Sequence, residues 1–154
     1  MDITELLTPD CTKCAVAGAS KKKILEIVSQ LAAPRLSGTT KGDIFDSLVN
    51  RERLGSTGIG LGIAIPHGRL PTQSSPVAVL ITLSEPVDFD AIDNQPVDII
   101  FALLVPENQH EEHLQTLASI AKRMSDKQCT RGLRDAASDD ELFARFTSKE
   151  TTCN

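Results

Sequence analysis

Apolar residues recur with the period of an α-helix in two stretches of the first third of the chain. The apolar stripe of the first stretch consists of Ile24, Leu25, Ile27, Val28 and Leu31. Ser20 can cap the start of this helix and Pro34 can end it, so we predict a helix between these two residues. The stripe of the second stretch consists of Ile44, Phe45, Leu48 and Val49. Thr40 and Asp43 precede it in a pattern close to a capping box, which predicts a helix that ends between residues 51 and 54.

The segment from Gly55 to Gly68 has a different pattern. It contains five of the nine glycines of the chain, a density that excludes a helix. Its larger apolar residues alternate, as in a strand with one apolar face, at Ile59, Leu61, Ile63 and Ile65. Pro66 has no N–H to donate to a neighbouring strand, so we expect the strand to stop there and His67 to lie just past its end.

Two further apolar runs predict strands, at residues 77–83 and 97–105. The second run is almost continuously apolar, which is typical of a strand buried on both faces between layers of helices. We also expect a short early strand at residues 14–17.

The last third of the chain returns to a helical period. Residues 110–125 predict a helix whose inward stripe is Leu114, Leu117, Ile120, Ala121 and Met124. Asp126 and Ser138 are candidate caps of two closing helices, at residues 127–136 and 139–146.

This order of helices, strands and helices predicts an α/β fold. We expect a single three-layer α/β/α domain over residues 1–154, with a mixed central sheet flanked by helices. The ordered core is expected at about residues 3–147, followed by a polar C-terminal tail at 148–154.

Composition excludes several classes of function. Aromatic residues make up 3% of the chain and the net charge is −5, so both stacking on bases and attraction to a phosphate backbone are weak. We therefore expect no nucleic-acid partner. The longest apolar run, residues 99–105, is too short to span a bilayer, and the first residues lack a basic and apolar leader. We expect a cytoplasmic protein without direct membrane insertion.

The four cysteines are Cys11, Cys14, Cys129 and Cys153. The first two have the C-x-x-C spacing of zinc and redox sites, but the sequence has no second such pair. We expect free thiols and no metal bound by them.

Three histidines are candidates for chemistry: His67, His110 and His113. A histidine can accept a phosphoryl group when one ring nitrogen is a nucleophile and a hydrogen bond on the other fixes the tautomer. The residues alone leave three interpretations of His67 open. It belongs to a phosphate or anion site, to a glycine-rich strand built for tight packing, or to a zinc site shared with the other two histidines.

A phosphoryl group requires hydrogen-bond donors that are in place before it is transferred. Arg51 can bind phosphate oxygens with two N–H groups at once. Hydroxyl and backbone N–H groups are offered by Gly55, Ser56, Thr57 and Gly58. His113 is expected in the first turn of its helix, where the positive end of the helix dipole favours an anion and disfavours a charged imidazole.

Three stretches of the chain match motifs of a known family. The first, at residues 51–70, is RERLGSTGIGLGIAIPHGRL. The others are FDAIDNQPVDIIFALLVP at residues 89–106 and HLQTLASIAKRM at residues 113–124. Together they resemble the EIIA domains of the mannitol and fructose class (EIIA type 2) of the bacterial phosphotransferase system, and in particular its nitrogen-regulatory branch. With the two leading helices, the resemblance covers nearly the whole chain.

This resemblance implies a phosphohistidine carrier, a phosphotransferase component with a covalent phosphohistidine intermediate and no cofactor. It implies that His67 accepts the phosphoryl group through Nε2 and that Arg51 and His113 are the other site residues, whereas His110 matches no part of the motif. The implied phosphodonor is a histidine phosphocarrier protein of the nitrogen-related relay. The implied targets are regulatory proteins such as potassium-transport or sensor-kinase components.

Two other functions remain open within the same family. The sequence shows no EIIB domain or permease, which also fits a regulatory binding module that acts mainly through its unphosphorylated surface. A component of fructose- or mannitol-type sugar uptake is the less favoured hypothesis.

Overall fold

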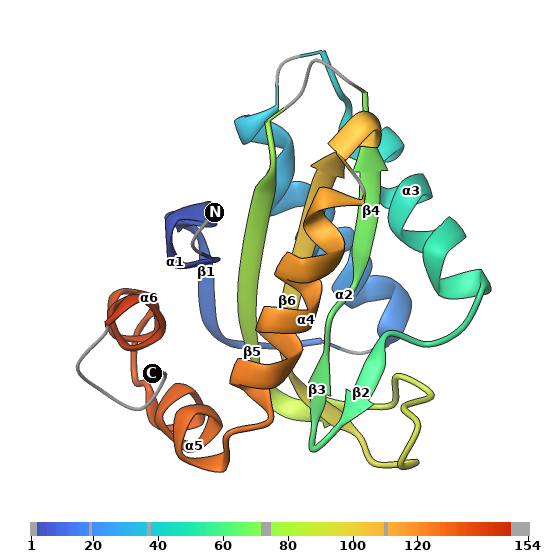
Figure 1. Ribbon diagram of the computed structural model, residues 1–154. Helices are drawn as coiled ribbons and strands as arrows, with labels where there is room; N and C mark the ends of the chain where they lie inside the picture. The colour runs from blue at the N-terminus through green and yellow to red at the C-terminus, as the bar shows by residue number, and fades with distance from the viewer. Residues whose placement is uncertain (1–2, 19, 37, 72–74, 110, 149–154) are drawn as a thin grey trace.

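A mixed β-sheet runs through the middle of the structure and carries helices on both faces (Figure 1). The structure is a computed structural model that describes residues 3–18, 20–36, 38–71, 75–109 and 111–148. Within them the strands are β1 Leu7–Val16, β2 Gly58–Gly60, β3 Ile63–Ala64, β4 His67–Leu70, β5 Val77–Val87 and β6 Val97–Pro106. The helices are α1 Ile3–Leu6, α2 Lys21–Ala32, α3 Lys41–Arg53, α4 Glu112–Met124, α5 Lys127–Asp135 and α6 Asp139–Thr147, with 3-10 turns η1 Ala33–Arg35 and η2 Glu107–Gln109.

The strands follow the order β1-β5-β6-β3-β2, and β4 also pairs with β6. The β1–β5, β3–β6 and β4–β6 pairs are parallel, whereas β5–β6 and β2–β3 are antiparallel. In Figure 1, α4 crosses in front of the sheet and α2 lies behind it. The predicted α/β fold with a mixed sheet between helices is confirmed.

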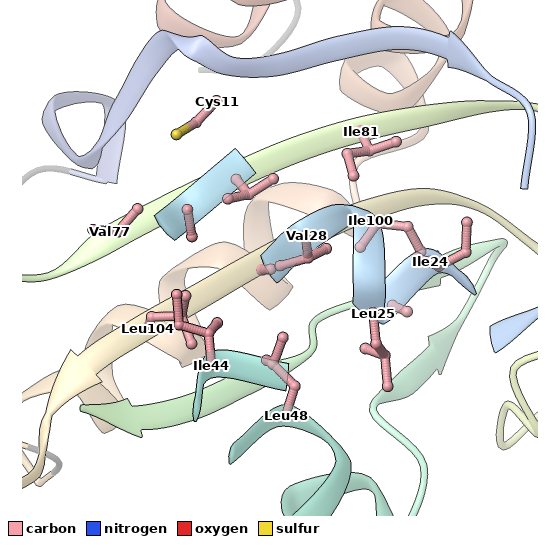
Figure 2. Packing of buried hydrophobic residues seen from close by; sticks show 14 of the residues in the cluster. Cys11, Ile24, Leu25, Val28, Ile44, Leu48, Val77, Ile81, Ile100 and Leu104 are labelled. Atoms are coloured by element: carbon pink, nitrogen blue, oxygen red, sulfur yellow. The ribbon is translucent and has the colours of Figure 1, made fainter. Parts of the chain in front are cut away.

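Alternation along β5 and β6 divides their side chains between two apolar cores. Packed with α2 and α3 are Val79, Ile81, Ile100, Ala102 and Leu104. Figure 2 labels Ile81, Ile100 and Leu104 among them. Packed with α4, α5 and α6 are Ala78, Leu80, Ile99, Phe101 and Leu103. Because both faces are covered, β6 is buried at almost every position, as its continuous apolar run predicted.

The predicted helix starts are confirmed by side-chain caps. Thr40 and Asp43 form a reciprocal capping box at the start of α3. The side chains of Ser20, Asp126 and Ser138 each accept a hydrogen bond from the first turn of the helix that follows. No helix within the described ranges combines the length and the apolar character that crossing a bilayer requires.

The sequence pattern misplaced the first strand. It predicted residues 14–17, but β1 runs from Leu7 to Val16 and follows a helix, α1, that the pattern did not reveal. β1 lies at one edge of the sheet, where it pairs with β5 and with no other strand of the described residues. Polar residues are tolerated on such an edge strand, so the alternation is weak.

The single strand predicted over Ile59–Ile65 is instead a hairpin of β2 and β3. Leu61 and Gly62 form its turn with positive φ angles of 61° and 80°. Two positive φ angles suit the twist of a tight hairpin, and glycine adopts them without strain. The turn leaves Ile59 and Leu61 exposed while Ile63 and Ile65 are buried, so these four residues do not share one apolar face.

The inward stripe predicted for residues 110–125 is wrong at its first member. Leu114 is 50% exposed, and the buried positions of the first turns are His113 and Thr116. The helix begins at Glu112, and His110 lies outside the described residues.

The expectation of free thiols holds for Cys11 and Cys14. It is wrong for the buried Cys129, which is disulfide-bonded. Cys153 lies outside the described residues.

Candidate functional site

His67 is the first residue of β4 and begins a strand segment in line with β3. Both segments keep the same register along β6, where His67 pairs with Leu103. Between them the Pro66 carbonyl accepts a hydrogen bond from the Leu103 N–H at 2.9 Å. The predicted strand end before His67 is confirmed for β3, which ends at Ala64. The pattern missed that the Pro66 carbonyl keeps the pairing with β6, so that His67 begins the next strand segment, β4.

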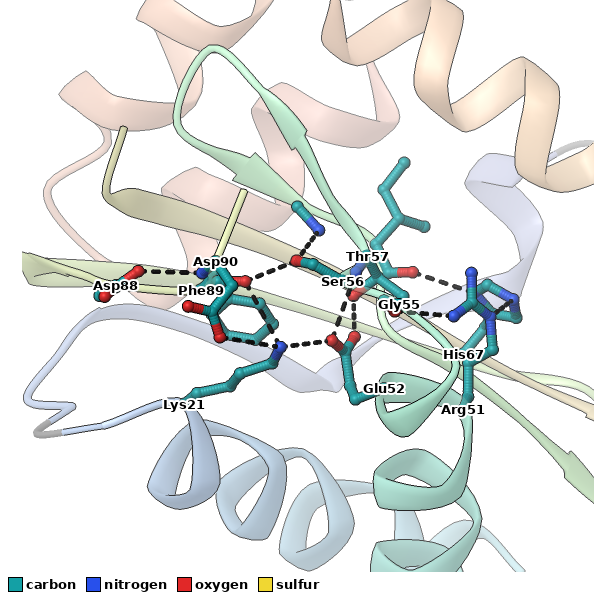
Figure 3. A network of polar contacts seen from close by, with 12 residues as sticks. Lys21, Arg51, Glu52, Gly55, Ser56, Thr57, His67, Asp88, Phe89 and Asp90 are labelled. Carbon is teal, nitrogen blue, oxygen red and sulfur yellow. Dashed lines mark hydrogen bonds and ion pairs between the residues drawn. The ribbon is translucent and has the colours of Figure 1, made fainter. Parts of the chain in front are cut away.

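The hydrogen bonds of the His67 ring define its tautomer. Nδ1 lies 3.1 Å from the Ile65 carbonyl oxygen, which can only accept. Nε2 lies 3.1 Å from Nε of Arg51, which can only donate. Nδ1 therefore carries the proton and Nε2 the lone pair. The half-buried ring is held as a neutral imidazole whose nucleophilic nitrogen faces a guanidinium (Figure 3).

Arg51 reaches this position from the last turn of α3. Its Nη1 donates to the Gly55 carbonyl at 2.9 Å while its Nε donates to His67. A guanidinium has five N–H donors. The described contacts occupy two of them, so the group is fixed at two points and keeps donors for an anion.

The predicted phosphate-binding loop uses its donors inside the protein. The Thr57 N–H and hydroxyl both donate to the Glu52 carboxylate. The Gly58 N–H donates to Ser56 Oγ at 3.0 Å, and the Ser56 hydroxyl donates to the Phe89 carbonyl. These bonds shape the loop that presents the Gly55 carbonyl to Arg51 (Figure 3).

His113 lies in the first turn of α4, as predicted, and is 5% exposed. Its Nδ1 is 3.3 Å from Thr116 Oγ1, a contact that restrains the ring. Leu117 lies one turn further along the same face and lines a hollow together with His67. The face of α4 that carries His113 is thus directed to the side of the sheet on which His67 lies.

Two hollows open beside His67, and both His67 and Arg51 line each of them. The larger has a volume of about 780 Å³ and is lined by α3, β4 and Leu114 of α4. The smaller has a volume of about 270 Å³ and is lined by residues of the Gly55–Gly58 loop, the hairpin and α4. Leu54 and Leu114, which line the larger hollow, are 84% and 50% exposed. His67 is therefore reachable from outside, past apolar side chains.

The described part of the chain contains no group of three or more His, Cys, Asp or Glu side chains placed to hold a metal ion. His110, one member of the zinc hypothesis, lies outside it. Burial raises the pKa of the Cys11 thiol, which makes this free cysteine a poor nucleophile or metal ligand.

Glu52 was not singled out from the sequence. It follows Arg51 in the last turn of α3, where the negative end of the helix dipole disfavours a carboxylate. Its side chain is nevertheless 6% exposed and bonded to both Lys21 and Thr57. The sequence did contain a signal for this residue, because an acidic side chain at a helix C-terminus usually has a specific cationic or hydrogen-bonding partner.

Comparison with known proteins adds independent observations. The family model for the EIIA 2 component of the phosphoenolpyruvate-dependent sugar phosphotransferase system matches residues 5–149. The nitrogen regulatory protein of Escherichia coli (strain K12) is 48% identical over 153 residues, which cover 99% of this chain and 93% of that protein. The nitrogen regulatory protein of Pseudomonas aeruginosa is 45% identical over 141 residues, which cover 92% of each.

Two solved structures are also similar. The crystal structure of nitrogen regulatory protein IIA-Ntr from Neisseria meningitidis has a TM-score of 0.86 and 39% identity, covering 94% of this chain and 99% of that one. The IIA mannitol structure from Escherichia coli has a TM-score of 0.67 at 17% identity, covering 94% and 98%. The second similarity concerns the fold alone.

Proposed function

This chain belongs to the EIIA 2 family of the phosphoenolpyruvate-dependent sugar phosphotransferase system, and on that premise we propose that it carries a phosphoryl group on Nε2 of His67. The observation that carries the proposal is the tautomer of the ring. The Ile65 carbonyl holds the proton on Nδ1, so the lone pair lies on Nε2, which can attack phosphorus once the Arg51 Nε–H releases it.

The transfer requires little covalent machinery. Nε2 of His67 attacks the phosphorus of an incoming phosphohistidine, the Nε2–P bond forms, and the donor's N–P bond breaks with its electron pair left on the donor nitrogen. His67 keeps its Nδ1 proton, so its ring becomes positively charged. The Ile65 carbonyl oxygen, 3.1 Å from Nδ1, stabilises this charge.

Arg51 changes partner during this step. In the resting state its Nε–H is bonded to the lone pair that must attack, so this bond has to break as phosphorus approaches. The released N–H and the donors outside the described contacts can then bind phosphoryl oxygens. The bond from Nη1 to the Gly55 carbonyl keeps the guanidinium beside His67 throughout.

We assign supporting roles to the other predicted site residues. His113, restrained by Thr116 near the positive end of α4, is proposed to donate to the bound phosphoryl group. Gly55, Ser56, Thr57 and Gly58 are proposed to act through the Gly55 carbonyl and the shape of the hollow. Direct N–H donation to phosphate by Thr57 or Gly58 requires their present bonds to open.

The phosphodonor is proposed to be a histidine phosphocarrier protein of the nitrogen-related relay, and the output to be control of regulatory proteins in the cytoplasm. The nitrogen regulatory proteins that this chain resembles along almost all of its length support this choice over sugar uptake. Potassium-transport and sensor-kinase components are the proposed kinds of target. A phosphoryl group adds close to two negative charges beside Arg51, which is enough to change the partner that this surface prefers.

The test is phosphorylation of the purified chain by phosphoenolpyruvate and the upstream relay proteins. We expect an acid-labile, base-stable phosphate on the wild type and on the control His110→Ala, and none on His67→Ala. Phosphate that persists on His67→Ala would contradict the proposal.

A second candidate function is a binding module that acts through the unphosphorylated surface. The exposed side chains of Leu54 and Leu114 beside His67 favour protein docking at this place. Capture of partners from a lysate by wild type, His67→Ala and His67→Asp separates the two functions. Equal capture by all three forms would favour the module, whereas a difference between them supports the phosphorylation switch.

A further inference from the structure

Glu52 places a nearly buried carboxylate directly behind the arginine that binds His67. Its side chain is 6% exposed and that of Lys21 is 22% exposed, and the Lys21 ammonium lies 2.7 Å from Glu52 Oε2. The other described partners of the carboxylate are the N–H and the hydroxyl of Thr57. Figure 3 shows Glu52 between Lys21 on one side and the Gly55–Thr57 loop on the other.

The Lys21 ammonium joins this cluster to a third segment. It lies 5.0 Å from the centroid of the Phe89 ring and 3.4 Å from the Phe89 carbonyl oxygen. The same carbonyl accepts the hydroxyl of Ser56. The ammonium also lies 3.9 Å from Oδ2 of the exposed Asp90. Lys21 thus links the start of α2 to the end of α3 and to the segment at Phe89, and the Phe89 carbonyl links that segment to the loop.

Burying this ion pair is costly, because removal of two charges from water is only partly offset by their attraction. Replacement of a buried ion pair by well-packed apolar residues of similar volume is often neutral or stabilising, so packing of the two helices alone does not require these charges. What an apolar pair cannot do is accept the N–H and the hydroxyl of Thr57. The carboxylate of Glu52 is therefore needed to hold the loop through Thr57.

The loop in turn determines where Arg51 lies. The Gly55 N–H donates to the Glu52 carbonyl at 3.1 Å, and Thr57, two residues further on, is bonded to the Glu52 side chain. The Gly55 carbonyl accepts a hydrogen bond from Nη1 of Arg51. The chain on both sides of this carbonyl is thus hydrogen-bonded to Glu52, through the Gly55 N–H before it and through Thr57 after it. Gly55 adopts a φ of 152°, where other residues are strained, so the backbone at this turn requires glycine, and the hydrogen bonds on either side restrain it.

We propose that Glu52, neutralised by Lys21, is a positioning residue for phosphoryl transfer that holds the Gly55 carbonyl so that Arg51 stays directed at His67. This inference rests on the proposed function of His67. Glu52 does not touch the phosphoryl group and acts through the loop and the guanidinium.

The experiment measures the rate of phosphoryl transfer to His67 at saturating phosphodonor for wild type, Glu52→Gln, Lys21→Gln and Lys21→Arg. Misplacement of a catalytic group lowers such rates by about 10- to 100-fold, and we expect this loss for Glu52→Gln and Lys21→Gln. Lys21→Arg keeps the charge and its contact with the Phe89 ring, so its rate should remain close to that of wild type. The matched control is Glu26→Gln, which removes a more exposed carboxylate that pairs with Lys23 at 3.8 Å.

The distinguishing measurement is a double-mutant cycle with Arg51→Ala. If Glu52 acts through Arg51, Glu52→Gln causes no further loss in the Arg51→Ala background. An equal loss in both backgrounds, or a wild-type rate for Glu52→Gln, overturns the inference. If Glu52→Gln fails to fold, the Glu52→Gln/Lys21→Gln double variant, which removes both charges, replaces it in the cycle. Absence of phosphate on the wild type contradicts instead the proposed function of His67.

Discussion

The centre of the sheet and the segment from Arg51 to Leu70 are built in different ways. In β5 and β6, alternating apolar residues enter two cores, and most positions are interchangeable with other apolar residues of similar size. In the segment, glycines with positive φ angles and single polar contacts fix one ring and one guanidinium. We expect substitutions in the centre of the sheet to lower the free energy of unfolding, and substitutions at the residues of the segment that contact His67 or Arg51 to slow the proposed phosphoryl transfer.

The largest change in stability is expected in the centre of the sheet. Phe101 is fully buried, and its ring centroid lies 5.1 Å from that of Phe146. Phe101→Ala should lower the free energy of unfolding by about 3–5 kcal/mol, because it loses buried apolar area and leaves a cavity. Urea unfolding measures this loss.

Phosphoryl transfer per folded molecule should be unchanged in Phe101→Ala. Ile92→Ala is the control, since this side chain is 84% exposed and its loss should change stability by less than about 0.5 kcal/mol. A slow transfer step in folded Phe101→Ala would show that the two regions are not separable.

The second largest effect is expected for Arg51→Ala, and it should appear in the rate. Loss of one preorganised donor to a transition-state oxyanion typically costs about 100- to 1,000-fold, so transfer to His67 should slow to this degree while the unfolding free energy stays near that of wild type. Arg53→Ala is the matched control, because Arg53 lies two residues further along α3 and bonds to Asn50 at 3.4 Å. Equal rates for the two variants would exclude Arg51 from the transfer step.

The two regions also differ in how well they can be predicted from sequence. Long periodic elements such as α2, α3 and β6 follow from apolar spacing, because burial on a regular element imposes its period on the sequence. The position of Arg51 near His67 followed from the family motif. The proton on Nδ1 could not be predicted from that motif. It depends on the Ile65 carbonyl pointing toward the His67 ring, and a backbone contact of this kind leaves no pattern in residue types.

The turn between β2 and β3 shows the same limit. Alternation of Ile59, Leu61, Ile63 and Ile65 favoured a continuous strand, and only the observed φ angles show that the chain reverses at Leu61 and Gly62. Leucine is a rare choice for a left-handed position, so its type gave no warning of the turn.

This turn provides a third, smaller test of the comparison. In Gly62→Ala the backbone would have to keep a φ of 80°, which strains alanine. The new Cβ would lie 2.7 Å from Nη2 of Arg134 and 2.9 Å from Oδ1 of Asp98. We expect a loss of about 1–2 kcal/mol from the backbone conformation alone, measured by urea unfolding. Leu61→Gly is the matched variant. Glycine relieves the strain of the left-handed conformation at position 61 but gives the unfolded chain more freedom, so the free energy of unfolding should change little. Slower phosphoryl transfer in Gly62→Ala would place the hairpin turn among the functional parts.

The smallest effect concerns Asp93, whose carboxylate ties the hairpin turn to the segment before β6. Its two oxygens accept the N–H groups of Leu61 at 3.0 Å and Gln95 at 3.1 Å, and these bonds hold the pKa of Asp93 below its ordinary value of 3.8. A depressed folded-state pKa contributes stability that is present above the unfolded pKa and is lost as pH falls through the folded one. The melting temperature of the wild type should therefore fall more steeply below about pH 4 than that of Asp93→Asn, which has one acceptor oxygen and no charge to titrate. Above that pH the two curves should run parallel, with Asp93→Asn slightly lower. Parallel curves through the acid range as well would mean that the turn is held by Gly62 and the backbone alone, and that the carboxylate does not contribute to it.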